Sequence, residues 1–139
     1  MNLKEGFIFL LPMIYSALYI DKTDEMGRGV FTKQSIPANT IIEISPVIVM
    51  NAEERKLLDQ TLLHDYIFEW GPGSDQCCMA LGYVAVYNHS YSSNCEYEMD
   101  FEAAVIKIKT IRNVRPGEEL FINYNGDWNN VKPVWFDKK

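Results

Sequence analysis

The chain has 139 residues, 47% of them hydrophobic and 13% aromatic, and its formal net charge is -6. This length predicts one domain around a single core, and so apolar a composition excludes intrinsic disorder. The acidic balance argues against direct nucleic-acid binding, which needs clustered Lys and Arg, and leaves open either a basic partner or an ordinary soluble surface.

The longest apolar run lies at the start, GFIFLLPMIYSALYI over residues 6–20. It is shorter than a bilayer span, Pro12 interrupts it, and neither a basic leader nor a small-residue cleavage site frames it. A signal peptide or membrane anchor is the alternative to a packed segment. We expect an apolar extension over residues 1–16, a first strand at Leu18 to Ile20, and no membrane partner.

A polar turn, DKTDEMGRG over residues 21–29, precedes a short strand, VFT. The two glycines that flank Arg28 carry no Cβ and would let the backbone approach a ligand closely. The segment TIIEISPVIVM, residues 40–50, reads as two β-branched runs separated at Ser45-Pro46. Asn51 and Glu54 then predict a capping box at the start of a short helix that ends near Gln60.

The next segment, TLLHDYIFEW over residues 61–70, predicts a strand with Tyr66, Phe68 and Trp70 on one face, which favours a place in the core. His64 is expected to be structural. Residues 77–86 support no assignment, whereas VIKIKTI over residues 105–111 alternates as a strand does. Short strands with frequent turns and one good helix predict a mostly β class.

Three cysteines, Cys77, Cys78 and Cys95, cannot all pair, and two adjacent cysteines bridge poorly. With two histidines and no C-x-x-C spacing, a zinc site lacks ligands. The pattern indicates a reducing compartment, cytoplasmic or, in a eukaryote, nuclear, and no metal.

Four segments in order resemble the motifs of the SET-domain lysine methyltransferases. They are GRGVF at 27–31, YIFEW at 66–70, YNHSYSSN at 87–94 and GEELFINYN at 117–125. The resemblance implies a SET domain over residues 17–126, built of several small β-sheets with one or two short helices. It also implies a knot-like crossing of the C-terminal segment, which would bring Asn88-His89 to Tyr124, and a tail over residues 127–139 packed near the site.

The resemblance further implies S-adenosylmethionine as cofactor and methyl transfer to the side-chain amine of a lysine. Tyr124 would be the catalytic residue and would align the amine without acting as general base, since a phenol with a pKa of about 10 is mostly protonated. Ile122 and Tyr87 would belong to the substrate channel, and the small Ile122 favours di- or trimethylation. The residues expected to hold the cofactor are Arg28, Gly29, Asn88 and His89, with Tyr66 and Trp128 as weaker candidates for walls.

The chain departs from the family in its tail, GDWNNVKPVWFDKK, which lacks the zinc-binding cysteines of many eukaryotic members. This compact form looks most like small bacterial or viral members, and Trp128, Trp135 and Phe136 would pack over the site instead. The implied partner is a lysine-containing basic protein or peptide, and a homodimer that completes the channel is left open. The alternative function is a non-catalytic SET-fold module that binds basic peptides.

Overall fold

The computed structural model of the protein describes residues 11–126 and residue 131. Within those residues strands predominate over helices, in agreement with the mostly β class that the sequence predicts. The strands are β1 (Met13–Ile14), β2 (Leu18–Lys22), β3 (Arg28–Thr32), β4 (Ile41–Met50), β5 (Phe68–Trp70), β6 (Gln76–Ala80), β7 (Asn88–His89), β8 (Cys95–Asp100), β9 (Val105–Thr110) and β10 (Glu119–Ile122). The helices are α1 (Ala52–Leu58) and the 3-10 helices η1 (Leu62–Asp65) and η2 (Val84–Val86).

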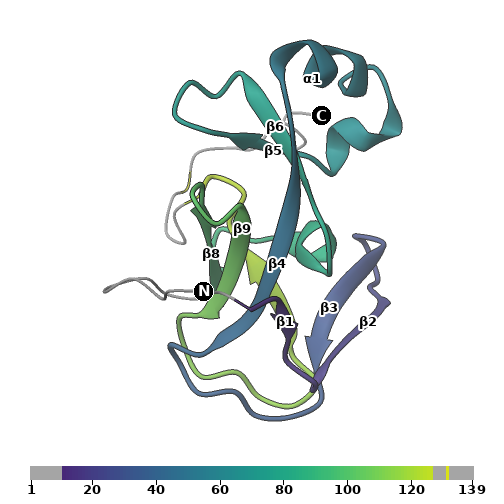
Figure 1. Cartoon of the computed structure of the whole chain (residues 1–139). Helices are drawn as coiled ribbons and strands as arrows, with labels where there is room; N and C mark the ends of the chain where they lie inside the picture. Colours follow the sequence, from purple (N-terminus) through teal and green to yellow (C-terminus); the bar gives the residue numbers. More distant parts are fainter. Residues whose placement is uncertain (1–10, 127–130, 132–139) are drawn as a thin grey trace, which may run out of the picture.

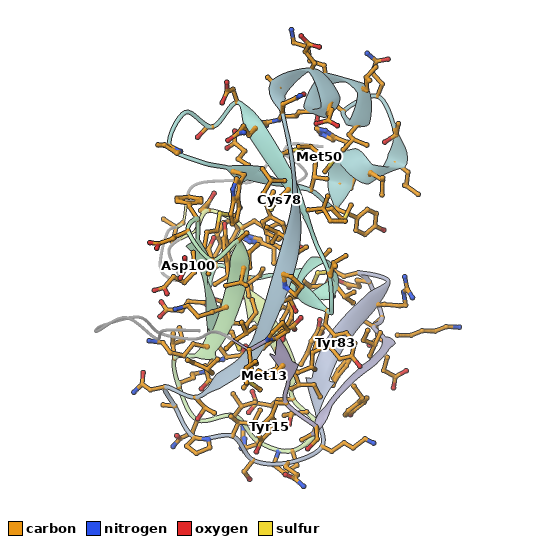
Figure 2. All side chains as sticks on the ribbon, in the orientation of Figure 1. Met13, Tyr15, Met50, Cys78, Tyr83 and Asp100 are labelled. Carbon is orange, nitrogen blue, oxygen red and sulfur yellow. The ribbon has the colours of Figure 1, made fainter. Side chains whose placement is uncertain are left out.

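The strands form two sheets that the chain visits alternately. The larger has the order β5-β6-β4-β9-β8 with β1 added on β4, and the smaller has the order β2-β3-β10-β7. Neighbours in both sheets are antiparallel except β10 and β7, which are parallel. Figure 1 shows β4 running most of the length of the molecule, with α1, β5 and β6 at one end and β1 and the β2–β3 hairpin toward the other. Figure 2 labels Met50 and Cys78 near the first end and Met13 and Tyr15 near the second.

Strand β4 is continuous through Pro46, where the sequence predicts two separate runs. Residues up to Pro46 pair with β9, and residues from Val47 onward pair with β6. Proline has no N–H to give to a sheet. It is tolerated in this long strand because it sits at the point where the strand changes partner.

The strand predicted over residues 61–70 is wrong in its first part. Thr61 accepts a hydrogen bond from the N–H of Leu63 and caps η1, so that only Phe68–Trp70 is extended. Phe68 and Trp70 alternate in β5 and pack with the core, Trp70 against Phe101, whereas Tyr66 lies outside the strand and keeps 41% of its surface exposed.

Both ends of the expected helix agree with the structure to within two residues. Asn51 accepts from the N–H of Glu54 and the Glu54 carboxylate accepts from the N–H of Asn51, which confirms the capping box, and α1 ends at Leu58. None of its side chains is buried. In the part of the chain that the structure describes, no helix is both long and apolar enough to cross a membrane.

The core lies between the two sheets and takes its large side chains from both. The alternation expected in β9 is confirmed, since Ile106 and Ile108 are fully buried while Lys107 and Lys109 reach the surface and pair with Glu98 and Glu96 of β8. Of the expected N-terminal extension, residues 1–10 lie outside the described residues and Met13–Ile14 form β1 on the edge of β4. Apart from residue 131, the tail 127–139, including Trp128, lies outside them too.

Candidate active site

The parallel pair of β7 and β10 brings together two segments that are more than thirty residues apart in sequence. Asn88 lies opposite Phe121 and His89 opposite Ile122. Just beyond β10, the main-chain N–H of Tyr124 donates to Nδ1 of His89 at 3.0 Å. This confirms that the asparagine-histidine segment and the closing tyrosine meet, while threading of the C-terminal segment through a loop stays a prediction.

A cleft of about 1010 Å³ opens at this meeting point. Its walls come from the turn between β2 and β3, from η1 and β5, from η2 and β7, and from the segment after β10. Six of the predicted site residues contribute to its lining: Arg28, Tyr66, Tyr87, Asn88, His89 and Tyr124. The structure therefore gathers residues from four separate segments around one space.

Asn88 is fixed by two acceptors on neighbouring strands. Its Nδ2 donates to the main-chain carbonyl of Arg28 at 3.1 Å and to Oε2 of Glu119 at 2.8 Å. Partial burial raises the pKa of the Glu119 carboxyl, and the hydrogen bond from Asn88 acts in the opposite direction. The amide thus ties β3 and β10 to the lining of the cleft.

Gly29 follows Arg28 in β3 and contributes in a way that the sequence did not indicate. A Cβ at this position would collide with the carboxylate of Glu119 and would lie 3.0 Å from Nδ2 of Asn88. Its backbone is not left-handed, so the need for glycine comes from space alone. The missing side chain makes room for the Asn88–Glu119 pair, and Gly29 itself is not part of the cleft lining.

Tyr124 is held at both of its ends. Its hydroxyl donates to the main-chain carbonyl of Tyr87 at 2.8 Å, and its N–H is bound by His89 as described above. Burial of the hydroxyl raises its pKa to about 12, with smaller contributions from Tyr66 and Glu119. The phenol therefore stays protonated at neutral pH, which favours a positioning role over that of a base.

The His89 side chain serves the fold more than the cleft. Only 8% of the residue is exposed, and its ring packs edge-on against Tyr91 at a centroid distance of 4.4 Å. Because Nδ1 accepts from a main-chain N–H, a neutral ring carries its proton on Nε2. The imidazole fixes the position of Tyr124.

The two residues assigned to a substrate channel have buried side chains. Ile122 is completely buried in the core cluster and does not contribute to the cleft lining. Tyr87 is also completely buried, and its hydroxyl donates to Oε1 of Glu43 at 3.0 Å. The main-chain carbonyl of Tyr87 faces the site and accepts a hydrogen bond from the hydroxyl of Tyr124.

The sequence reasoning missed Glu43, a carboxylate buried near the start of β4. It accepts from Ser45 Oγ at 2.6 Å and from the N–H of Tyr83 at 2.8 Å, in addition to Tyr87. Figure 2 labels Tyr83 between β4 and the β2–β3 hairpin, at the entry to η2. A charged residue inside the β-branched run TIIEI was the available signal, because such a residue is buried only when it is bonded.

Glu119 was missed as well, although it belongs to the quoted GEELFINYN segment. The cleft also takes apolar and aromatic side chains that no motif marked. Among them are Met26, Tyr97 and Met99. In the described part of the chain, no three His, Cys, Asp or Glu side chains are grouped so as to hold a metal ion.

Comparison with known proteins agrees with this arrangement. A family model for the SET domain matches residues 27–125. A Schizosaccharomyces pombe protein named histone-lysine N-methyltransferase, H3 lysine-37 specific, is 38% identical over 128 residues, which are 91% of this chain and 82% of that protein. The crystal structure of a Plasmodium falciparum protein assigned as a histone methyltransferase superposes with a TM-score of 0.63 at 31% identity and covers 83% of this chain and 98% of its own.

The chain therefore belongs to the SET-domain family. Its class is that of the protein-lysine N-methyltransferases. Both of these relatives are eukaryotic, whereas the missing tail cysteines suggested a likeness to small bacterial or viral members.

Proposed function

We propose that the chain transfers a methyl group from S-adenosylmethionine to the side-chain amine of a lysine in a basic protein. The observation that carries the proposal is the fixed hydroxyl of Tyr124 in the cleft that Arg28 and Asn88 also line. A tyrosine held at its N–H and at its hydroxyl is suited to align a reacting amine.

The residues of the cleft fit the cofactor. Its volume of about 1010 Å³ lies at the upper end of the range for small-molecule sites, which leaves room for a lysine side chain beside a nucleoside. Asn88 offers a polar side chain, and Tyr66, Phe68 and Met99 offer aromatic and apolar walls. When bound, S-adenosylmethionine supplies a methyl group on a positively charged sulfur, which an amine can displace.

The acceptor lysine must lose its proton before it can react. With a reference pKa of about 10.4, only about one lysine in 2500 is neutral at pH 7. Tyr124 does not act as the base, because its own pKa is about 12. Its proton is directed to the carbonyl of Tyr87, so its oxygen can accept from the amine and orient the nitrogen.

The charge of the protein favours a basic acceptor. The net charge is -6, although within the cleft lining the acidic Asp65 and Glu69 are balanced by Lys22 and Arg28. Since the fission yeast relative is named for lysine 37 of histone H3, we propose a histone-like protein as the acceptor class. Such an acceptor would require the enzyme to reach the nucleus in a eukaryote. A homodimer stays a prediction.

Calorimetric titration of the protein with S-adenosylmethionine tests the cofactor site. We expect one saturable site that Asn88→Ala weakens and that Asn51→Ala, a substitution at the cap of α1 outside the cleft, leaves unchanged. Absence of binding by folded wild-type protein would overturn the proposal.

Transfer of a labelled methyl group to recombinant histone H3 tests the acceptor. The matched control is a histone H3 in which arginine replaces the lysine for which the relative is named. Labelling of wild-type histone that is lost in the control would identify the same lysine as in the relative. Cofactor binding without transfer to histones or to other basic proteins would instead favour a non-catalytic module that binds basic peptides.

A further inference from the structure

We propose that Glu119 is a positioning residue that orients the side-chain amide of Asn88 toward the cofactor. Glu119 begins β10, and its carboxylate accepts from Nδ2 of Asn88, which lines the cleft, while Glu119 itself does not contribute to the lining. The inference rests on the proposed function, because it concerns how that same cofactor site is kept in a binding-competent state.

The hydrogen bonds of Asn88 define which end of its amide faces inward. The amide has one NH₂ group with two hydrogens and one oxygen that only accepts. Both groups that face Nδ2, the carbonyl of Arg28 and the carboxylate of Glu119, are acceptors. A reversed amide would set its oxygen against both of them, which is repulsive, so the pair fixes a single orientation.

This orientation decides what Asn88 can offer to a ligand. With Nδ2 bonded to the protein on both hydrogens, the oxygen Oδ1 is the atom that Asn88 presents to the cleft it lines. An oxygen acceptor is what the ammonium group at the amino-acid end of S-adenosylmethionine requires. An amide free to rotate would present its NH₂ group part of the time and would bind an ammonium group less well.

Gly29 supports the importance of the pair. A Cβ at this position would collide with the carboxylate of Glu119 and would lie 3.0 Å from Nδ2 of Asn88. A glycine inside a strand weakens it, and this one lies where the two side chains need space. The strand therefore carries a residue of poor strand propensity at the position that allows the two side chains to meet.

The test compares the affinity for S-adenosylmethionine of three variants, two at Glu119 and one at its neighbour Glu118. Glu119→Ala removes the acceptor, and we expect its dissociation constant for S-adenosylmethionine to rise about tenfold. Glu119→Gln can keep an oxygen toward Nδ2 of Asn88, so we expect it to retain most of the affinity. Glu118→Ala is the matched control, because Glu118 pairs with Arg115 outside the cleft.

The glutamine variant separates positioning from simple attraction. If the negative charge of Glu119 acted directly on the cationic ligand, Glu119→Gln would lose as much affinity as Glu119→Ala, and the proposal would be overturned. The Michaelis constant for the cofactor is expected to rise in Glu119→Ala while that for the protein acceptor stays unchanged. A general loss of folding would alter both, and the thermal unfolding midpoint measures it separately.

A double-mutant cycle tests whether Glu119 acts through Asn88. In an Asn88→Ala background, Glu119→Ala should weaken cofactor binding no further, whereas an undiminished tenfold effect would overturn the proposal. Failure of the wild type to bind S-adenosylmethionine would reject the proposed function. A wild type that binds, together with a Glu119→Ala variant that binds equally well, would reject only the role of Glu119.

Discussion

The Tyr124 hydroxyl donates to the main-chain carbonyl of Tyr87 at 2.8 Å, and this contact joins the end of β10 to the segment that enters β7. Tyr87 is itself anchored, since its own hydroxyl is bound by the buried Glu43 of β4. The orientation of the proposed catalytic tyrosine therefore depends on a sequence of contacts that begins in the core of the larger sheet.

Tyr124→Phe should abolish most of the methyl transfer while it leaves the cofactor site intact. We expect a fall in kcat of about 100-fold or more, because the amine loses the oxygen that orients it, and little change in the dissociation constant for S-adenosylmethionine. Steady-state kinetics and calorimetry measure the two quantities. Tyr19→Phe is the matched control, since Tyr19 stacks on Phe31 outside the cleft. Unchanged transfer by Tyr124→Phe would remove Tyr124 from the chemistry.

Gly29→Ala should lower both stability and cofactor affinity. The added methyl group meets the Glu119 carboxylate and must displace the Asn88–Glu119 pair. Overpacking of this kind costs about 1–3 kcal/mol, measurable by chemical denaturation. Gly73→Ala, in the turn after β5, is the control, since its nearest neighbour is the side chain of Asp75 at 3.2 Å. Adding Glu119→Ala to Gly29→Ala should restore stability, and no recovery would show that the clash has another source.

Glu43 should make the stability of the protein depend on pH. Burial raises its pKa above the value of 4.5, and this effect exceeds the opposing hydrogen bonds from Ser45, Tyr83 and Tyr87. Between pH 4.5 and the raised pKa the folded protein holds a proton that the unfolded chain has released. The stability that this extra proton contributes is therefore fully present below pH 4.5. It is lost as the pH rises through the pKa of Glu43 in the folded protein.

The measurement is the free energy of unfolding of wild type minus that of Glu43→Gln, from about pH 4 to about pH 8. This difference should fall as the pH rises. Glu53→Gln, on the exposed helix α1, is the control for the effect of a Glu→Gln substitution itself. If the difference in unfolding free energy grew toward neutral pH, the hydrogen bonds to Glu43 would lower its pKa by more than burial raises it.

The three cysteines should be unreactive in the folded protein. Cys77, Cys78 and Cys95 are free and completely buried, and burial raises the pKa of Cys78 and Cys95 to about 12. Since the thiolate is the reactive form, a thiol reagent at about pH 8 should modify none of them before unfolding and all of them in denaturant. Rapid modification of one native thiol would show that the strands around it open readily.

Much of the fold could be predicted from local patterns. The alternation in residues 105–111 and the capping box at Asn51 both depend on near neighbours in the sequence, and both are confirmed. The strand expected at Thr61 failed because its hydroxyl offers the chain a turn that the apolar pattern does not reveal. The break predicted at Pro46 was wrong because of a distant feature. Proline is accommodated within β4 since the strand changes its partner there from β9 to β6, which the local sequence does not reveal.

The site was predicted in part, through motifs rather than through physics. The motifs named Asn88, His89 and Tyr124, and the structure brings these three together. The motifs do not indicate whether a residue contributes its side chain or its main chain to the site. The side chains of His89 and Tyr87, for which a ligand contact was expected, are buried. Glu43 and Glu119 were missed because their importance arises from partners more than thirty residues away.

The parallel contact between β7 and β10 also bears on the order in which the protein forms. β7 has two residues, and its partner β10 is the last strand among the described residues. So small a pairing gains little until the intervening segment, residues 90–118, has brought the two strands together, and closing so long a segment has an entropic cost. Because Tyr124 follows β10 and lines the cleft, the cleft is complete only once this pairing has formed.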